Sequence, residues 1–142
     1  MNTVSSILSR KSVSVLSVTP ETPVIEALQI MSNKNIGSVI VMNEDQYLGI
    51  MTERDYSRKV ALKGKSSGET KVGEIMSTDL PSVKPSDSIE HCMQLMTDKF
   101  IRHLPVLEDN ELVGIVSIGD LVKHIIDQKD YIINCLEHYI TS

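Results

Sequence analysis

Two short motifs combine a hydroxyl residue with a carboxylate three positions later: Thr52 with Asp55, and Ser117 with Asp120. Each follows an apolar, β-branched stretch typical of a strand, and each is expected to begin a helix. Such a pair can form a capping box, in which each side chain bonds the other residue's amide. It can also bind a nucleotide, because a helix N-terminus attracts phosphate and a carboxylate accepts bonds from ribose hydroxyls. One motif taken alone favours capping, since short motifs often match by chance.

The motif is duplicated, which changes that balance. Residues 49–55 match residues 114–120 at an offset of 65 positions, and the same offset aligns Pro20 with Pro85 and Met31 with Met96. The alignment runs without a gap from Ser17 to Asp55. A constant offset over this length indicates a tandem repeat.

Each repeat is predicted to be an α/β (α+β) unit with the order β-α-β-β-α. A short strand (13–18; 81–83) precedes a helix whose apolar residues recur at i, i+3, i+4 and i+7: Val24, Ala27, Leu28 and Met31; Ile89, Cys92, Met93 and Met96. Two strands joined by a polar turn follow (37–42 and 47–51; 103–107 and 111–116), as in a hairpin. A second helix starts at Thr52 and at Ser117.

Helices are also predicted outside the repeats, at 3–10 and 130–140. The first repeat with its N-terminal helix is placed at 1–62, a linker at 63–72, and the second repeat with its C-terminal helix at 73–142. Gly, Ser and Lys at 63–70 indicate a flexible, exposed linker. The helix at 130–140 has an apolar face, which either packs on its own domain or forms a subunit interface.

Composition excludes several functions. The net charge of −5, the lack of Trp and the single Phe argue against nucleic-acid binding. Two cysteines are too few for a disulfide scaffold, and no apolar run is long enough for a membrane span or signal peptide, so a cytoplasmic protein is expected. The four histidines do not have the spacing of metal ligands. His91 and His124 are expected on helices, where they would be solvent-facing or partly buried. No nucleophile elbow surrounds Ser117 or Cys92, and neither catalysis nor a catalytic cofactor is predicted.

The repeat resembles the CBS domain, named after cystathionine β-synthase, and the chain resembles a stand-alone pair of such domains. The similarity rests on residues 49–55 and 114–120, on Ile101–Val106 and on Val72–Met76, and it extends from about Ile7 to Ile126. It implies repeats paired about a pseudo-twofold axis, adenine nucleotides bound in clefts between them, and a homodimer. The implied nucleotide-binding residues are Val18, Thr19, Thr52, Arg54, Asp55, Val83, Lys84, Arg102, His103, Pro105, Ser117, Ile118 and Asp120.

The two sites are not expected to be equivalent. Arg102 aligns with Gly37, so only the second repeat carries a cation before its middle strand. Arg54 aligns with Gly119, so only the first has a cation inside the motif. Arg54 either binds phosphate, sharing a helix face with Arg58, or pairs with Glu53 or Asp55 at the surface.

The predicted function is a regulatory sensor that binds AMP, ADP, ATP or an NAD-like nucleotide and acts in trans on an unknown protein partner. The alternative is a CBS-pair scaffold that binds no ligand and assembles through the helix at 130–140.

Overall fold

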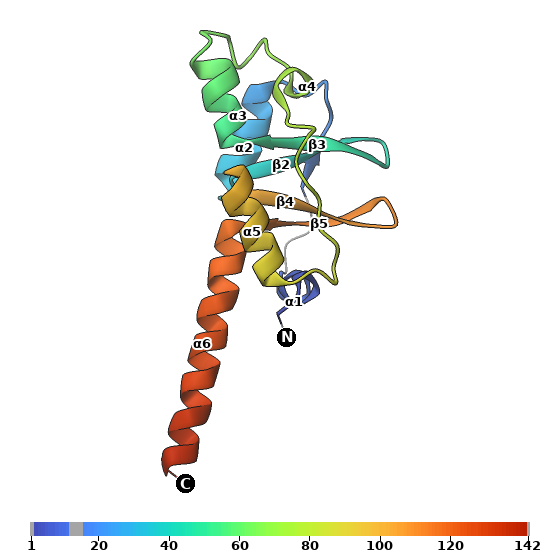
Figure 1. Ribbon diagram of the computed structural model, residues 1–142. Coiled ribbons are helices and arrows are strands. Elements are labelled where there is room, and N and C mark those ends of the chain that lie inside the picture. The colour runs from blue at the N-terminus through green and yellow to red at the C-terminus, as the bar shows by residue number, and fades with distance from the viewer. Residues whose placement is uncertain (1, 12–15, 142) are drawn as a thin grey trace. The chain divides into compact units, whose positions relative to one another are not determined.

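The computed structural model describes residues 2–11 and 16–141 (Figure 1). The chain forms two compact units. The first-repeat unit consists of Val13–Pro81 with Glu108–Val113, and the second-repeat unit of Met1–Ser12, Ser82–Leu107 and Gly114–Ser142. Helices and two small sheets are mixed, which confirms the α+β class.

The first-repeat unit is built on a sheet in the order β1-β2-β3, with β1 (Ser17–Val18) parallel and β3 (Gln46–Thr52) antiparallel to β2 (Ser38–Asn43). Its helical segments are α2 (Val24–Lys34), α3 (Glu53–Tyr56), the π-helix η1 (Ser57–Ala61) and α4 (Val72–Ile75). Val24, Ala27 and Met31 point from α2 into a core with Val39, Val41 and Met51 of the sheet. The predicted 3.6-residue period of this helix is thereby confirmed.

The second-repeat unit contains the hairpin of β4 (His103–Glu108) and β5 (Glu111–Ser117), together with α1 (Val4–Arg10), α5 (Ile89–Lys99) and α6 (Ile118–Thr141). Its core joins Ile89, Cys92 and Met96 of α5 to Leu104, Val106, Val116 and Leu121, and α1 adds Val4 and Ile7. The Val4 amide donates to the Asp87 carbonyl at 2.9 Å. Helix α1, which precedes the first repeat in sequence, therefore packs on the second.

The structure revises three sequence-based predictions. Of the strand predicted at 13–18, residues 13–15 lie outside the described residues, and β1 spans Ser17–Val18. The strand predicted at 81–83 is reduced to a single parallel bridge from Val83 to Val106. The helices predicted from Ser117 and at 130–140 are one continuous helix, α6, because no Gly or Pro interrupts the chain after Gly119.

His124 is a further correction, since it is only 5% exposed. It lies one turn after the buried Leu121 on the core-facing side of α6. Neither ring nitrogen has a hydrogen-bond partner among the described residues. His91 is exposed on α5, as predicted.

The segment between the repeats is exposed from residue 61 to residue 66, but its end is anchored. Thr70 is buried, and its carbonyl accepts a hydrogen bond of 2.8 Å from the Val24 amide at the start of α2. The Ile25 amide donates to the Ser67 carbonyl at 2.9 Å. These bonds satisfy amides of the first turn of α2 that have no partner within the helix.

A close backbone contact brings Ser77 beside the first-repeat motif. Ser77 and Ile50 of β3 exchange backbone hydrogen bonds of 2.8 and 3.0 Å. A Cβ at the neighbouring Gly49 would lie 2.5 Å from the Ser77 carbonyl oxygen. Glycine is therefore required there for this pairing.

We expect Gly49→Ala to lower the free energy of unfolding by about 1–3 kcal/mol, because the added methyl group collides with a hydrogen-bonded carbonyl. Gly68→Ala is the matched control, since its nearest neighbour would be the Ser66 Oγ at 3.7 Å. The control should leave stability unchanged or raise it by about 0.4–1 kcal/mol. Urea denaturation measures both, and equal stability of the two variants would contradict the close contact at Gly49.

Candidate functional site

Asp55 is the most enclosed carboxylate of the first-repeat motif, with 7% of its side chain exposed. Its Oδ2 accepts hydrogen bonds from the Thr52 amide at 3.0 Å and the Thr52 hydroxyl at 3.1 Å. Its amide donates back to the Thr52 Oγ1 at 3.1 Å, which completes a capping box at the start of α3. The structure thus confirms the capping role for this pair.

The other oxygen of Asp55 is also occupied. Oδ1 accepts from the Ser77 hydroxyl at 2.8 Å and forms an ion pair with the Lys59 Nζ at 3.0 Å. Lys59 lies in η1 and also donates to the Ile75 carbonyl at 2.9 Å. A ribose that binds Asp55 would have to replace one of these protein contacts.

Asp120 repeats the capping geometry in the second-repeat unit. The Ser117 amide donates to Asp120 Oδ2 at 2.9 Å, and the Asp120 amide donates to Ser117 Oγ at 3.1 Å. The Lys11 Nζ lies 2.9 Å from the same Oδ2 and 2.9 Å from the Ile115 carbonyl oxygen. These contacts to the carboxylate all use Oδ2, and 24% of the side chain is exposed. Asp120 is thus more accessible to a ligand than Asp55.

Each unit therefore neutralises its motif aspartate with a lysine that also bonds a backbone carbonyl. Lys59 comes from the helical segment that follows the motif, whereas Lys11 comes from the end of α1. Sequence reasoning missed Lys11 and Ser77 and gave Lys59 no role. The spacing of Lys59, four residues after Asp55, was a usable signal. Lys11 lies 109 positions from Asp120, and no local pattern connects them.

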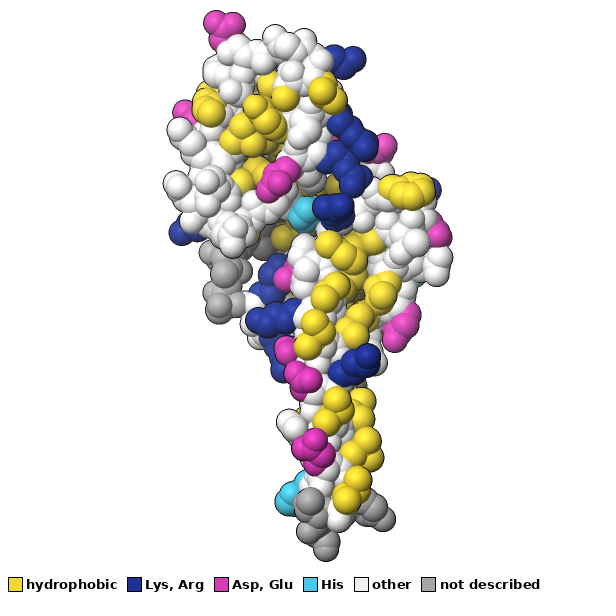
Figure 2. Space-filling view, turned by 90° about the vertical axis from the view of Figure 1, so that its left-hand side faces the viewer, with side chains coloured by type: hydrophobic (Ala, Val, Ile, Leu, Met, Phe, Trp, Pro, Cys, Tyr) yellow, Lys and Arg dark blue, Asp and Glu magenta, His cyan; other side chains and the backbone are white. Residues whose placement is uncertain are grey.

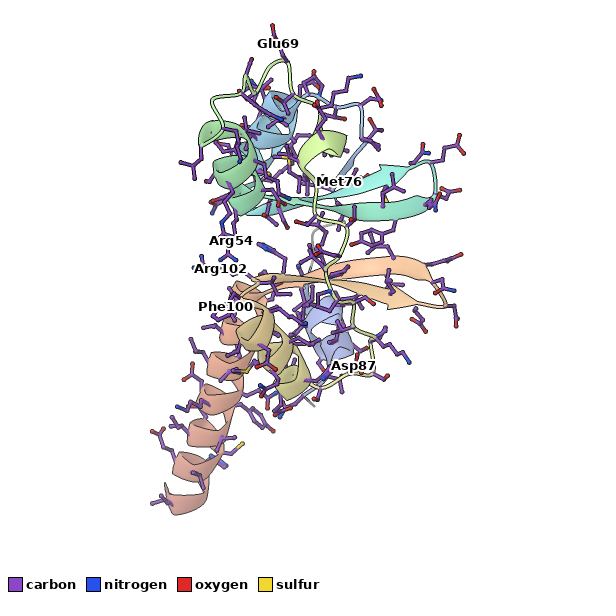
Figure 3. The ribbon with its side chains drawn as sticks, turned by 45° about the horizontal axis from the view of Figure 1, so that its top comes forward. Arg54, Glu69, Met76, Asp87, Phe100 and Arg102 are labelled. Carbon is purple, nitrogen blue, oxygen red and sulfur yellow. The ribbon has the colours of Figure 1, made fainter. Side chains whose placement is uncertain are left out.

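The remaining first-repeat candidates are Arg54, Thr19 and Val18. Arg54 lies in α3 (Figure 3), and Asp55 forms an ion pair with Lys59 of η1. Thr19 is exposed, and its amide donates to the Thr22 hydroxyl at 3.1 Å. Val18 is buried in the core, which its side chain helps to form.

The second-repeat candidates fall into an exposed and a buried group. Arg102, between α5 and β4, is exposed (Figure 3), and its carbonyl accepts from the Ile118 amide at 2.9 Å. The structure thus brings Arg102 to the first turn of α6, beside the Ser117–Asp120 motif. The other members are exposed Ile118 and Lys84, half-buried His103, and buried Pro105 and Val83.

Cys92, in the core of the second-repeat unit, is held in its unreactive, protonated form. Burial, assisted by the negative charge of Asp87, raises the pKa of the Cys92 thiol to about 11. A thiol that stays protonated at neutral pH is a poor nucleophile. Among the described residues there is also no group of three or more His, Cys, Asp or Glu side chains that could hold a metal ion.

The two aspartates should contribute unequally to stability. We expect Asp55→Ala to cost about 3 kcal/mol or more, because it leaves the partly buried donors of Thr52, Ser77 and Lys59 without their acceptor. Asp120→Ala should cost about 1 kcal/mol, the usual value of a capping hydrogen bond, since this carboxylate is partly open to water. Asp45→Ala, in the exposed turn after β2, is the control and should be neutral. The midpoints of urea denaturation measure the stability of the three variants. Equal losses of stability for the Asp55 and Asp120 variants would refute the difference between the environments of the two carboxylates.

No helix in the described part of the chain is long and apolar enough to cross a membrane.

Comparisons with known proteins agree with the duplicated motif. The CBS domain family model matches residues 4–62 and 72–127. The chain is 42% identical over 127 residues to the mitochondrial CBS domain-containing protein CBSX3 of Arabidopsis thaliana, covering 86% of this chain but only 62% of that relative. A putative signal-transduction protein with CBS domains from Burkholderia ambifaria has 45% identity and a TM-score of 0.84, with 88% and 94% of the two chains covered. A hexameric CBS-CP12 protein from bloom-forming cyanobacteria has 29% identity and a TM-score of 0.74 over 86% and 70% of the chains.

The similar proteins include stand-alone CBS-domain proteins and also an enzyme, the inosine-5'-monophosphate dehydrogenase of Methanocaldococcus jannaschii, which is 33% identical over 77% of this chain and 21% of that relative. The chain belongs to the CBS domain family and carries two tandem CBS domains.

Proposed function

We propose that this protein is a regulatory sensor that binds an adenine nucleotide, such as AMP, ADP, ATP or NAD, and acts in trans on a protein partner. CBS-pair proteins are generally regulatory modules, which supports the class of function. The nucleotide is a ligand rather than a catalytic cofactor. The partner is a protein that distinguishes the bound from the free state, because a ligand regulates only through different affinities for two states.

The proposal rests on one observation, namely which oxygen of the Asp120 carboxylate is hydrogen-bonded. Its Oδ2 is used by the Ser117 amide and Lys11, and Oδ1 takes part in neither bond. A carboxylate oxygen can accept hydrogen bonds from the hydroxyls of a ribose. Cap and ligand can therefore share this side chain.

The surroundings of Asp120 suit the phosphate of the same ligand. The Ser117 hydroxyl and the N-terminus of the 24-residue helix α6 lie beside the carboxylate. Lys11 bonds Asp120 directly, and the exposed Arg102, whose carbonyl bonds the Ile118 amide, is a second cationic residue next to this motif. Helix amides and cations of this kind favour an anion.

A thermal-shift panel with AMP, ADP, ATP and NAD tests the proposal. A ligand at a hundredfold over its dissociation constant stabilises the folded state by about 2.7 kcal/mol, which raises the melting temperature of a chain this size by roughly 5–10 °C. We expect one of the four to give this shift, and Asp120→Ala to abolish it. Asp45→Ala should retain the shift. No shift in protein freed of co-purified nucleotide would contradict the sensor function.

A second candidate is assembly through α6. Figure 2 shows hydrophobic side chains in a line along the C-terminal part of this helix. Ile126, Ile133, Leu136 and Ile140 are 50–79% exposed. With Val122 and Lys129 they alternate at spacings of four and three residues, the pattern by which two helices pack together. This favours the interface over packing on the chain's own domain.

Assembly of copies of this chain is compatible with the sensor function. The homodimer stays a prediction, and the cyanobacterial CBS-CP12 protein is a hexamer by its title. The cytoplasmic location also stays a prediction, since the name of the Arabidopsis relative places that protein in mitochondria.

We expect Leu136→Asp to lower the oligomeric state, because it places a charge in the middle of the apolar line. Asn134→Asp is the matched control, since it adds the same charge at an exposed polar position two residues away. Sedimentation velocity over a range of protein concentrations measures both. A wild-type chain that stays monomeric, or two variants that sediment alike, would refute assembly through this face.

A further inference from the structure

Lys11 occupies a defined position beside the Ser117–Asp120 motif. Its Nζ lies 2.9 Å from Asp120 Oδ2 and 2.9 Å from the Ile115 carbonyl oxygen. An ammonium group has three N–H donors, so these two contacts leave one. The side chain is 31% exposed, and a ligand at Asp120 can reach it from solvent.

The position of Lys11 is set by the packing of α1. The side chain of Leu8 in α1 packs against Gly114 of β5, where a Cβ would lie 2.8 Å from the Leu8 Cδ2. Arg10 forms an ion pair of 3.5 Å with Asp127 of α6, and the Lys11 amide donates to the Leu8 carbonyl at 3.2 Å. Lys11 is thus held at the motif by neighbouring contacts as well as by its own charge.

We propose that Lys11 is a specificity-determining residue of the second repeat and selects phosphorylated nucleosides over nucleosides. The inference rests on the proposed nucleotide-binding function. A ribose on Oδ1 of Asp120 leaves the Lys11–Asp120 bond intact, and the third N–H of Lys11 then donates to a phosphate oxygen. Such a charge-assisted bond is strong, and an uncharged nucleoside lacks the group that accepts it.

The motif aspartate of the first repeat is bonded differently. Lys59 also bridges its motif aspartate and a backbone carbonyl, but Asp55 is buried and both of its oxygens have protein partners. A ribose cannot bind there without displacing a protein donor. The difference between the aspartates, rather than between the lysines, restricts this selection to the second repeat.

The experiment compares dissociation constants for AMP and adenosine, measured by calorimetry on the full chain. Lys11→Met keeps most of the side-chain volume and removes the charge, whereas Lys11→Arg keeps the charge. Arg10→Met is the matched control, because it removes a neighbouring cation that pairs with Asp127 instead of Asp120. Melting temperatures without ligand establish that each variant is folded.

We expect Lys11→Met to weaken AMP binding about tenfold or more and to leave adenosine binding unchanged. Lys11→Arg should retain most of the preference for AMP, and Arg10→Met all of it. Raising the salt concentration should weaken AMP binding to the wild type much more than adenosine binding.

Two results would overturn the inference and leave the sensor function standing. Equal weakening of both ligands would make Lys11 a structural support for Asp120. Tighter binding of both would make it an internal competitor for the carboxylate. A wild-type chain that binds neither ligand and gives no shift with any nucleotide of the thermal panel would end the proposed function together with this inference.

Discussion

The structure of both units depends on keeping a carboxylate satisfied where a strand becomes a helix. Removing a carboxylate from water is costly unless hydrogen bonds and an opposite charge replace the lost hydration. Asp55 obtains these from Thr52, Ser77 and Lys59. Ser77 reaches it only because Gly49 admits a carbonyl that any side chain would exclude. The second-repeat unit meets the same requirement through Lys11, and so through the packing of α1 against Gly114.

The two repeats have kept the same cap while changing what surrounds it. His124 aligns with Lys59 at the offset of 65, so the second repeat has no lysine four residues after its aspartate. The imidazole at that position is buried with no hydrogen-bond partner among the described residues, and the positive charge arrives instead from α1. This cation bonds Oδ2 of Asp120, the oxygen that the cap also uses, and Asp120 stays partly open to solvent, whereas Asp55 has protein partners on both oxygens.

Local pattern was sufficient to predict the repeats, the hairpins, helices α2 and α5, and the reciprocal caps at Thr52 and Ser117. Each of these follows from hydrophobic period and from residue types only three or four positions apart. The same rules were also sufficient to predict that α6 is one continuous helix, since no Gly or Pro follows Gly119. The contacts of Ser77 and Lys11 were beyond this reasoning because they depend on tertiary packing across 22 and 109 positions. The burial of His124 depends in the same way on which elements pack against α6.

Capping and ligand binding began as competing interpretations of one motif, and the hydrogen bonds show when they compete. In the first repeat the cap takes Oδ2 of Asp55, while Ser77 and Lys59 take Oδ1, so a ligand would have to displace a protein donor. In the second repeat both the cap and the lysine fall on Oδ2 of Asp120, and a ligand on Oδ1 would displace neither. The same three-residue spacing can therefore be structural in one repeat and also functional in the other. The factor that separates the two roles is whether Oδ1 of the motif aspartate already has protein partners, as it has in Asp55 through Ser77 and Lys59.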